Sequence, residues 1–289
     1  MGEGSVPFAG GGYVTPFFDT ARVEALAATL AQIVKPGNTV LELGAGAGNI
    51  SLIAARYAKR VIAVEDDDSL HAIFASMLGS STLTNIELVK PRTLLQFEPS
   101  ETVDVLICEL LSPALLAQPQ APVLNKFLRY LKPGGAVLPY GLTNMVTLVE
   151  AEFAPYGIPF RFPYRERDDL PMSSPKTAPV VLNQFAFVEG LPEQVHEHLT
   201  VTAIAGGICN AIRVESIVSI GADLAIKGSP ILCTPLVVPL LENVPMAAGR
   251  RYHVEIAYEH ALDVTDHPRF TATIEPANTE FSRRGTAAA

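Results

Sequence analysis

The feature that most constrains this 289-residue chain is the stretch VLELGAGAGNISLIAA at residues 40–55. A short apolar run leads into three closely spaced glycines, Gly44, Gly46 and Gly48, and a segment rich in Ala, Leu and Ile follows. Apolar runs of this length are typical of buried parallel strands, and the glycines permit a tight turn into a helix. The stretch therefore predicts one strand–turn–helix unit of an α/β sheet.

Strand and helix patterns continue to alternate as far as about Tyr140. The predicted strands cover residues 39–44, 60–67, 85–90, 103–110 and 136–141, and the predicted helices cover 18–34, 49–59, 69–78 and 123–131. Each predicted strand is a short Val/Ile/Leu run bounded by turn residues, as in a parallel sheet covered by helices. A Lys-Pro-Gly-Gly stop at 132–135 separates the last helix from the last strand. We therefore expect a Rossmann-like α/β sheet.

Beyond Tyr140 the pattern changes. Residues 154–179 are rich in proline and charge, and they are expected to form an arm or a long loop. Short alternating runs lie around this segment, at 142–153, 181–189, 199–205, 209–221, 235–242, 251–260 and 269–276. Runs of this kind, with few helical periods, predict an antiparallel β-barrel or sandwich. We therefore expect two domains, 1–140 and 141–289.

Charge and cysteine usage exclude several classes of protein. The net charge of −9 argues against nucleic-acid binding, which requires clustered Lys and Arg, and no apolar run is long enough to predict a membrane span. Cys108, Cys209 and Cys233 are odd in number and far apart, so neither a disulfide framework nor a cysteine zinc site is expected. His196 and His198 alternate in a polar stretch, and no metal site is predicted. A cytoplasmic location is the expectation.

The glycine loop is compatible with some cofactors and not with others. A P-loop is excluded because no Gly-Lys-Ser/Thr follows, and the dinucleotide fingerprint requires a third glycine where Asn49 stands. An acid, Glu65, closes the next strand about twenty residues on, where a carboxylate accepts ribose hydroxyls. Glu42 and Glu109 supply further negative charge for a cationic ligand. This combination favours S-adenosylmethionine, which has a ribose and a sulfonium but no pyrophosphate.

Several segments together resemble a known family. They are FFDTARVEAL, LELGAGAGN, VIAVEDD, ICELLSPALLAQ and LKPGGAVLPYGLTNMVTLVE. In sequence and order they are similar to the class I S-adenosylmethionine-dependent methyltransferases, and more specifically to the protein arginine methyltransferases. The resemblance covers residues 13–275 and is weaker in the second half. It implies a short N-terminal helix, a methyltransferase sheet and a C-terminal β-barrel.

The resemblance also implies roles for individual residues. Arg22 stands where the family has an arginine that binds the cofactor's carboxylate, and Glu65 stands where it has the ribose acid. Thr93 follows the third strand, where the family's loop meets adenine. Glu109 corresponds to the first of the two glutamates that clamp a guanidinium in the family. Besides these, Asp66 is a candidate cofactor contact, together with Glu42 and the three glycines of the loop.

Two departures from the family pattern bear on the substrate. Gln118 or its neighbour stands at the position of the second glutamate, and the Thr-His-Trp motif is replaced by Thr234, Pro235 and Leu236 in a chain without tryptophan. The loop after Glu109, LLSPALLAQPQAP, is apolar and contains three prolines. Such a loop is suited to a less charged acceptor than a peptidyl arginine. We therefore expect methyl transfer to the nitrogen, oxygen or carbon of a small molecule.

Several alternatives stay open at this level. They are an arginine methyltransferase acting on protein or free arginine, a non-catalytic binding module with this fold, and a nicotinamide-dependent oxidoreductase. Glu109 either orients or deprotonates the acceptor or only contacts the cofactor's amino group. Tyr13 either closes over the site or packs into the core. The 154–179 segment either forms a homodimer contact, as the family's arm does, or caps the substrate pocket.

Overall fold

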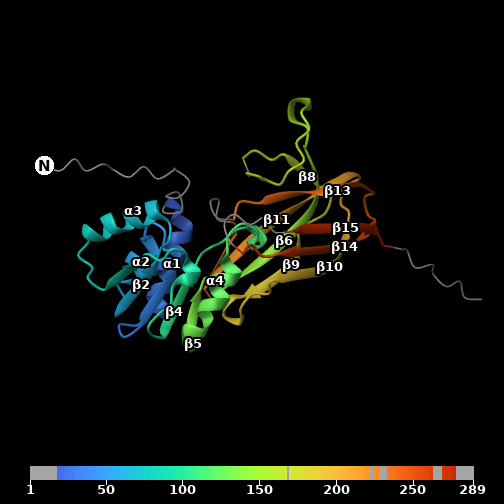
Figure 1. Cartoon of the computed structure of the whole chain (residues 1–289). Helices are drawn as coiled ribbons and strands as arrows, with labels where there is room; N and C mark the ends of the chain where they lie inside the picture. The colour runs from blue at the N-terminus through green and yellow to red at the C-terminus, as the bar shows by residue number, and fades with distance from the viewer. Residues whose placement is uncertain (1–17, 168, 222–223, 228–232, 263–268, 278–289) are drawn as a thin grey trace, which may run out of the picture.

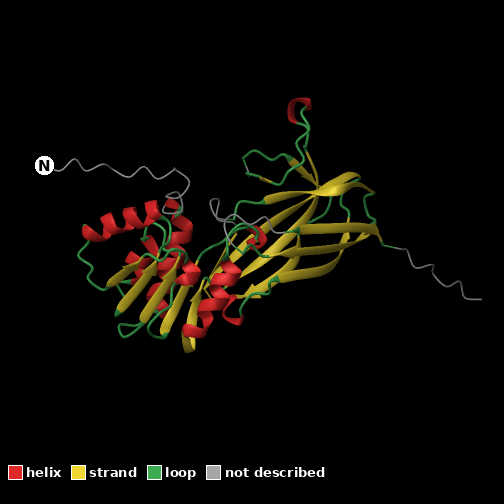
Figure 2. Ribbon diagram, viewed as in Figure 1, coloured by secondary structure: helices red, strands yellow, loops and turns green. Residues whose placement is uncertain are grey.

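The computed structural model describes residues 18–277, apart from 168, 222–223, 228–232 and 263–268. Tyr13 lies outside the described residues. The ribbon has two parts: one is a sheet flanked by helices, and the other is almost entirely strand (Figure 2). The predicted change of architecture is present: the strands pair in parallel up to residue 138 and antiparallel from residue 141 onward.

The first part is a five-stranded parallel sheet in the order β3-β2-β1-β4-β5. Its elements are α1 (Thr20–Ile33), β1 (Thr39–Leu43), α2 (Asn49–Ala54), β2 (Arg60–Val64), α3 (Asp68–Gly79), β3 (Ile86–Val89), β4 (Val103–Cys108), α4 (Gln120–Phe127) and β5 (Leu131–Leu138). The chain order reverses beside β1, which pairs with both β2 and β4. The carboxyl ends of these strands form the edge at which open α/β sheets bind ligands.

Two of the predicted boundaries that differ from the structure have a clear physical cause. The helix predicted to run to Lys59 ends at Ala54, because the chain turns there and Asn85 Nδ2 binds the carbonyl oxygens of Ala55 and Ala58. The Lys-Pro-Gly-Gly segment predicted as a stop lies inside β5. Gly135 makes this possible, since a Cβ there would lie 2.8 Å from the Asp104 carbonyl oxygen on the adjacent strand.

The second part consists of two antiparallel sheets. Its strands are β6 (Gly141–Ala151), β7 (Tyr164–Arg165), β8 (Ser173–Pro175), β9 (Val180–Ala186), β10 (Gln194–Thr202), β11 (Gly207–Gly221), β12 (Leu224–Lys227), β13 (Leu236–Met246), β14 (Arg251–Glu259) and β15 (Phe270–Pro276). The larger sheet has the order β7-β13-β11-β6-β8, and the smaller has the order β10-β14-β15. Apolar side chains from both sheets form a shared core, as the alternating runs predict.

The apolar core of the parallel sheet continues into the second part. Leu142 of β6, Val218 and Ile220 of β11, and Phe187 and Leu191 near β9 all pack in the same cluster as the parallel strands. The two parts are therefore joined by buried apolar contacts as well as by the chain. The arm between β6 and β9 contains two short strands, β7 and β8. It projects from the strand-rich part (Figure 1).

Candidate active site

Three predicted site segments meet at the carboxyl edge of the parallel sheet. The glycine loop follows β1, Glu65 follows β2 and Glu109 follows β4, and these three strands are neighbours. Helix α1 brings Arg22 to the same place, where its Nη1 lies 2.5 Å from Glu109 Oε2. Residues separated by as many as 87 positions in the sequence thus form one cluster.

The three loop glycines all have positive φ, but they serve different purposes. The φ values are 71° at Gly44, 58° at Gly46 and 88° at Gly48. A Cβ at Gly48 would lie 2.2 Å from the Phe74 ring, and one at Gly44 would lie 2.7 Å from Leu110. Gly46 is different, since nothing among the described residues lies within 4 Å of the position of its Cβ. Gly46 therefore borders space that the described residues leave open.

Gly46→Ala is expected to weaken S-adenosylmethionine binding at least tenfold while costing only about 1–2 kcal/mol of stability for the left-handed backbone. The added methyl group enters the space beside the loop. Gly134→Ala is the matched control, because Gly134 has φ 76° and similarly open surroundings. Calorimetric titration and urea unfolding measure the two effects. Equal cofactor affinity in the two variants would contradict a ligand at Gly46.

Glu65 holds the loop against the end of β2. Its Oε2 accepts the Gly46 N–H at 2.6 Å and its Oε1 accepts the Asp67 N–H at 2.8 Å. The side chain is buried, which raises the pKa of Glu65, and these two backbone hydrogen bonds oppose the rise. Each carboxylate oxygen has a second lone pair, so Glu65 retains acceptor capacity for two hydroxyl groups.

Asp66 contacts the loop that follows β3, at the residue after Thr93. Asp66 Oδ2 accepts the Leu94 N–H at 2.9 Å, which links the end of β2 to this loop. Thr93 precedes Leu94 and is exposed. Both predicted residues therefore lie at the same edge as Glu65, and the contact made by Asp66 positions the backbone beside Thr93.

Arg22 and Glu109 form a buried ion pair, with side chains 5% and 10% exposed. The Arg22 Nε also lies 3.8 Å from Asp19, the residue whose side chain caps α1. Burial raises the pKa of Glu109, and the neighbouring Arg22 guanidinium opposes this. Among the described residues, no donor bonds to Glu109 Oε1, which is buried. A buried acceptor of this kind costs free energy unless a ligand satisfies it.

Glu42 lies within β1, beneath the glycine loop, and accepts a hydrogen bond from Ser51 Oγ of α2. Burial raises the pKa of Glu42 to about 8, and the negative charge of Glu109 adds to the rise. The hydrogen bond between Ser51 and Glu42 thus anchors the first turn of α2. Its predicted contact with the cofactor stays a prediction.

Glu42→Gln is expected to be more stable than the wild type at alkaline pH. Since the folded-state pKa lies above the usual 4.5, the carboxyl contributes stability that is present below about pH 4.5 and lost as pH rises through about 8. The glutamine does not ionise, so its advantage grows by about 1.4 kcal/mol per pH unit across this window. Urea unfolding of both proteins from pH 5 to pH 9 measures the difference. If the difference in unfolding free energy between the two proteins did not change with pH, Glu42 would not be a buried carboxyl with a raised pKa.

Sequence patterns missed Gln120, the first residue of α4, which is fully buried. Its Oε1 accepts the Leu110 N–H at 2.8 Å, and its Nε2 donates to the Cys108 carbonyl at 2.8 Å. Gln120 therefore clamps the peptide groups on both sides of Glu109. Gln118, at the position of the family's second glutamate, is only half-buried.

Gln120→Leu is expected to destabilise the protein by about 2–4 kcal/mol, because it leaves a buried N–H and a buried carbonyl unsatisfied. It also releases the backbone that orients Glu109, so methyl transfer is expected to fall with it. Gln118→Leu is the matched control and should change stability by less than about 0.5 kcal/mol. Urea unfolding compares the two. Equal losses of stability in the two variants would show that the two hydrogen bonds of Gln120 do not stabilise the protein.

The loop after Glu109 is tied to the strand-rich part by a buried polar chain. Ala114 and Leu115 have φ values of 50° and 57°, which side-chain-bearing residues seldom adopt. The Ala114 N–H donates to Ser216 Oγ at 3.1 Å, and Ser216 Oγ donates to Asn144 Oδ1 at 2.6 Å. Asn144 in turn bonds to Asn183. These hydrogen bonds hold the strained loop in place. No local sequence pattern predicts them.

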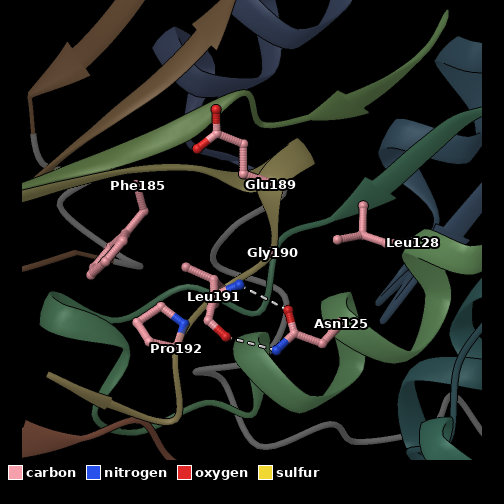
Figure 3. Close-up of a pocket in the computed structure, with 7 residues that line it drawn as sticks. All are labelled: Asn125, Leu128, Phe185, Glu189, Gly190, Leu191 and Pro192. Atoms are coloured by element: carbon pink, nitrogen blue, oxygen red, sulfur yellow. Dashed lines mark hydrogen bonds between the residues drawn. The ribbon is translucent and has the colours of Figure 1, made fainter.

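A hollow of about 600 Å³ lies elsewhere, and Figure 3 shows its lining residues. Asn125 binds both backbone groups of Leu191 there, at 2.8 Å each. Asn125 lies towards the end of α4 that leads to β5, and Glu109 is not among the residues that line the hollow. None of the predicted site residues lines it.

Other predicted features lie apart from the cluster. His196 and His198 are on β10, opposite Ala257 and Glu255 of β14. The described part of the chain contains no group of three or more His, Cys, Asp or Glu side chains arranged to hold a metal. Among the helices that the structure describes, none is both long and apolar enough to cross a membrane.

Comparisons with known proteins agree with this geometry. A family described as "Methyltransferase domain" matches residues 40–135. A protein of Methanothermobacter thermautotrophicus is 32% identical over 221 residues, 76% of this chain and 81% of its own length. An arginine N(omega)-methyltransferase of Streptomyces achromogenes subsp. streptozoticus is 32% identical over 127 residues, which covers 42% of this chain and 35% of the relative.

A solved structure extends the likeness to the whole fold. The Trypanosoma brucei PRMT1 enzyme–prozyme heterotetrameric complex with AdoHcy contains a chain that superposes with a TM-score of 0.75 at 17% identity, covering 91% of this chain and 92% of that one. The chain belongs to the class I S-adenosylmethionine-dependent methyltransferases. Its architecture is that of the protein arginine methyltransferases, and its cofactor is S-adenosylmethionine.

Proposed function

We propose that this enzyme transfers the methyl group of S-adenosylmethionine to nitrogen, oxygen or carbon of a small-molecule acceptor. The observation that carries the proposal is the acceptor loop. Between Leu110 and Asn125 it contains no acid, and residues 111–115 are all buried and, apart from Ser112, apolar. Glu109 is therefore the single carboxylate that this loop presents, which leaves a guanidinium without its second clamp.

The proposed cofactor contacts are Arg22, Glu42, Gly44, Gly46, Gly48, Glu65, Asp66, Thr93 and Glu109. The geometry fits this assignment at two points: the open space beside Gly46 and the spare acceptor capacity of Glu65. Bound S-adenosylmethionine supplies a methyl group on a positively charged sulfur. The excess of carboxylates over Arg22 in the cluster favours that positive charge. Arg22 bonds to Glu109 and, in this proposal, also meets the cofactor's carboxylate.

Glu109 is the proposed catalytic residue. Its buried Oε1 accepts a hydrogen bond from an N–H or O–H of the acceptor and so aims the lone pair of that atom at the methyl group. The raised pKa of Glu109 makes it a better proton acceptor than an exposed carboxylate. Gln120 keeps this carboxylate in place through the backbone on either side.

Arginine methylation is the second candidate. It is favoured by the name of the Streptomyces relative and by the retention of Glu109. The proposal and the methylation of arginine in proteins separate in one experiment: a cell extract is divided into small molecules and proteins, and each fraction is incubated with the enzyme and methyl-tritiated S-adenosylmethionine. The proposal expects label in the small-molecule fraction. Label in the protein fraction alone would refute it.

We further propose that residues 1–140 bind the cofactor and that residues 141–289 shape the acceptor site and a homodimer contact. The arm exposes Tyr156, Ile158 and Phe162, each more than 60% accessible, and apolar side chains gathered in this way mark interaction sites. Deletion of residues 155–162 is expected to halve the mass measured by light scattering. An unchanged mass would refute the dimer contact.

A cytoplasmic location and the lack of a nucleic-acid partner remain part of the proposal. The three cysteines are free and buried, which suits a reducing compartment. The net charge of −9 disfavours phosphate backbones.

A further inference from the structure

The loop that follows Glu109 contains two consecutive residues, Ala114 and Leu115, in a left-handed backbone conformation; we call them the strained pair. Their φ values are 50° and 57°, and both residues are fully buried. Residues with a Cβ rarely adopt this conformation, and it persists only where the surrounding structure holds it. Because such residues gather at active sites and ligand contacts, the contacts that hold this pair are relevant to the reaction.

Two hydrogen bonds from the strand-rich part hold the strained pair. The Ala114 N–H donates to Ser216 Oγ of β11 at 3.1 Å. The Leu115 carbonyl accepts the N–H of Ala261, which follows β14, at 3.0 Å. Since β11 belongs to the larger antiparallel sheet and β14 to the smaller one, both sheets fix the conformation of the pair.

A line of buried side chains runs from the first of these supports towards the second. Ser216 Oγ donates to Asn144 Oδ1 at 2.6 Å, and Asn144 Nδ2 donates to Asn183 Oδ1 at 2.7 Å. Asn183 Nδ2 then donates to Tyr258 Oη at 2.9 Å. The N–H of Ala114 can only donate, so every hydrogen bond in this line has the same direction, and each one polarises the next.

His260 completes the connection. Its ring meets the ring of Tyr258 edge-on, with centroids 5.6 Å apart, and its Nδ1 lies 2.7 Å from the Pro192 carbonyl oxygen. A carbonyl oxygen only accepts, so Nδ1 carries the proton. The chain continues directly from His260 into Ala261, which binds the second residue of the strained pair. These contacts form a closed circuit of Ala114, Ser216, Asn144, Asn183, Tyr258, His260, Ala261 and Leu115.

The loop held by this circuit begins at the proposed acceptor site. Its first residue, Leu110, packs over the cofactor loop, since a Cβ at Gly44 would lie 2.7 Å from the Leu110 side chain. Gln120 fixes the Leu110 N–H at 2.8 Å. Ala114 follows Glu109 by five residues, a span of at most about 18 Å. A change in the conformation of the strained pair therefore changes the wall beside Glu109.

We propose that Ser216 and Tyr258 are positioning residues that determine which acceptor the enzyme methylates. Through the circuit they hold the strained pair in one conformation, and this conformation gives the loop after Glu109 its shape. Loss of the circuit lets the pair relax to a common backbone conformation, while the glycine loop and Glu65 stay in place. This inference rests on the proposed small-molecule function and adds the residues that govern its selectivity.

The test follows the products that receive the methyl group. Each protein is incubated with methyl-tritiated S-adenosylmethionine and the small-molecule fraction of a cell extract, and the labelled products are separated by chromatography. In Ser216→Ala, the share of label in the main wild-type product is expected to fall at least about fivefold, because the Ala114 N–H loses its acceptor and the wall shifts. Tyr258→Phe removes only the last hydroxyl group of the line and should lower that share about twofold.

Thr177→Val is the matched control. The Thr177 hydroxyl is also buried and also accepts a backbone N–H, that of Leu148 at 3.1 Å, but this hydrogen bond is not part of the circuit. The control therefore removes the same kind of hydrogen bond as Ser216→Ala and should lose a similar amount of stability. Its labelled products should match those of the wild type. Calorimetric titration should give all three variants an S-adenosylmethionine affinity within about twofold of wild type.

The outcomes separate this inference from the function on which it rests. Wild-type proportions of labelled products in both Ser216→Ala and Tyr258→Phe would overturn the inference and leave the small-molecule function standing. An equally large change in Thr177→Val would also overturn it, since loss of stability alone would then alter the products. Label in the protein fraction alone would overturn the small-molecule function. The pattern of labelled proteins in the same variants would then show whether the circuit determines selectivity. If Ser216→Ala does not fold, the comparison of Tyr258→Phe with Thr177→Val decides.

Discussion

Glu65→Ala is expected to weaken S-adenosylmethionine binding by a factor of about 10² to 10⁴. A carboxylate that accepts from two ribose hydroxyls makes charge-assisted hydrogen bonds worth about 1.5–3 kcal/mol each, and the substitution removes both. It also frees the Gly46 N–H, which Glu65 holds at 2.6 Å, so the glycine loop loses an anchor. Calorimetric titration of the purified variant measures the loss.

Asp68→Ala is the matched control for this change. Asp68 lies three residues away, at the start of α3, but its carboxylate is exposed and pairs with Lys90 on the surface. Its removal should leave the cofactor affinity within about twofold of wild type. If Glu65→Ala bound S-adenosylmethionine as tightly as Asp68→Ala, the carboxyl end of β2 could not be the ribose site.

Glu109→Gln is expected to lower kcat by a factor of about 10² to 10⁴, with S-adenosylmethionine affinity changed by less than about tenfold. The amide keeps the size of the side chain but neither accepts the proton from the acceptor nor balances the buried Arg22. Some loss of stability accompanies the unpaired cation, so turnover is measured well below the unfolding temperature. Initial rates with saturating cofactor and acceptor give kcat.

The pH dependence of the same reaction provides a second measurement. Burial raises the pKa of Glu109, and the ionised form is the proton acceptor, so the rate should fall as pH drops through that raised pKa. This limb of the profile should be absent from the residual activity of Glu109→Gln. An identical acid limb in both proteins would assign the titration to another group and remove Glu109 from the proton transfer.

The central part of the site could be predicted because its signal is local. The glycine loop, Glu65 and Glu109 each follow a strand that reads clearly as a short apolar run, and neighbouring parallel strands bring their carboxyl ends together. The alternation of runs after Tyr140 similarly gave the antiparallel part. Boundaries were less predictable, since the end of α2 depends on Asn85, 30 residues away from Ala55.

The supporting residues of the site could not be predicted from local patterns. Ser216 meets the backbone of Ala114 across 102 positions of sequence, and Gln120 reads as an ordinary residue near a helix start. Nothing in spacing or composition distinguishes such partners, because their roles arise only when the two sheets pack. Arg22 is an intermediate case. The family resemblance located it, but only the structure shows that it bonds to Glu109.

The most direct test of the site at the carboxyl edge is thermal unfolding of the wild-type protein with S-adenosylmethionine, S-adenosylhomocysteine and NAD in separate samples. A ligand at a hundred times its Kd adds about 2.7 kcal/mol to stability, which corresponds to a shift of about 5–10 °C for a chain of this size. We expect that shift with the first two ligands and none with NAD. Stabilisation by NAD, or no response to either sulfur compound, would contradict it.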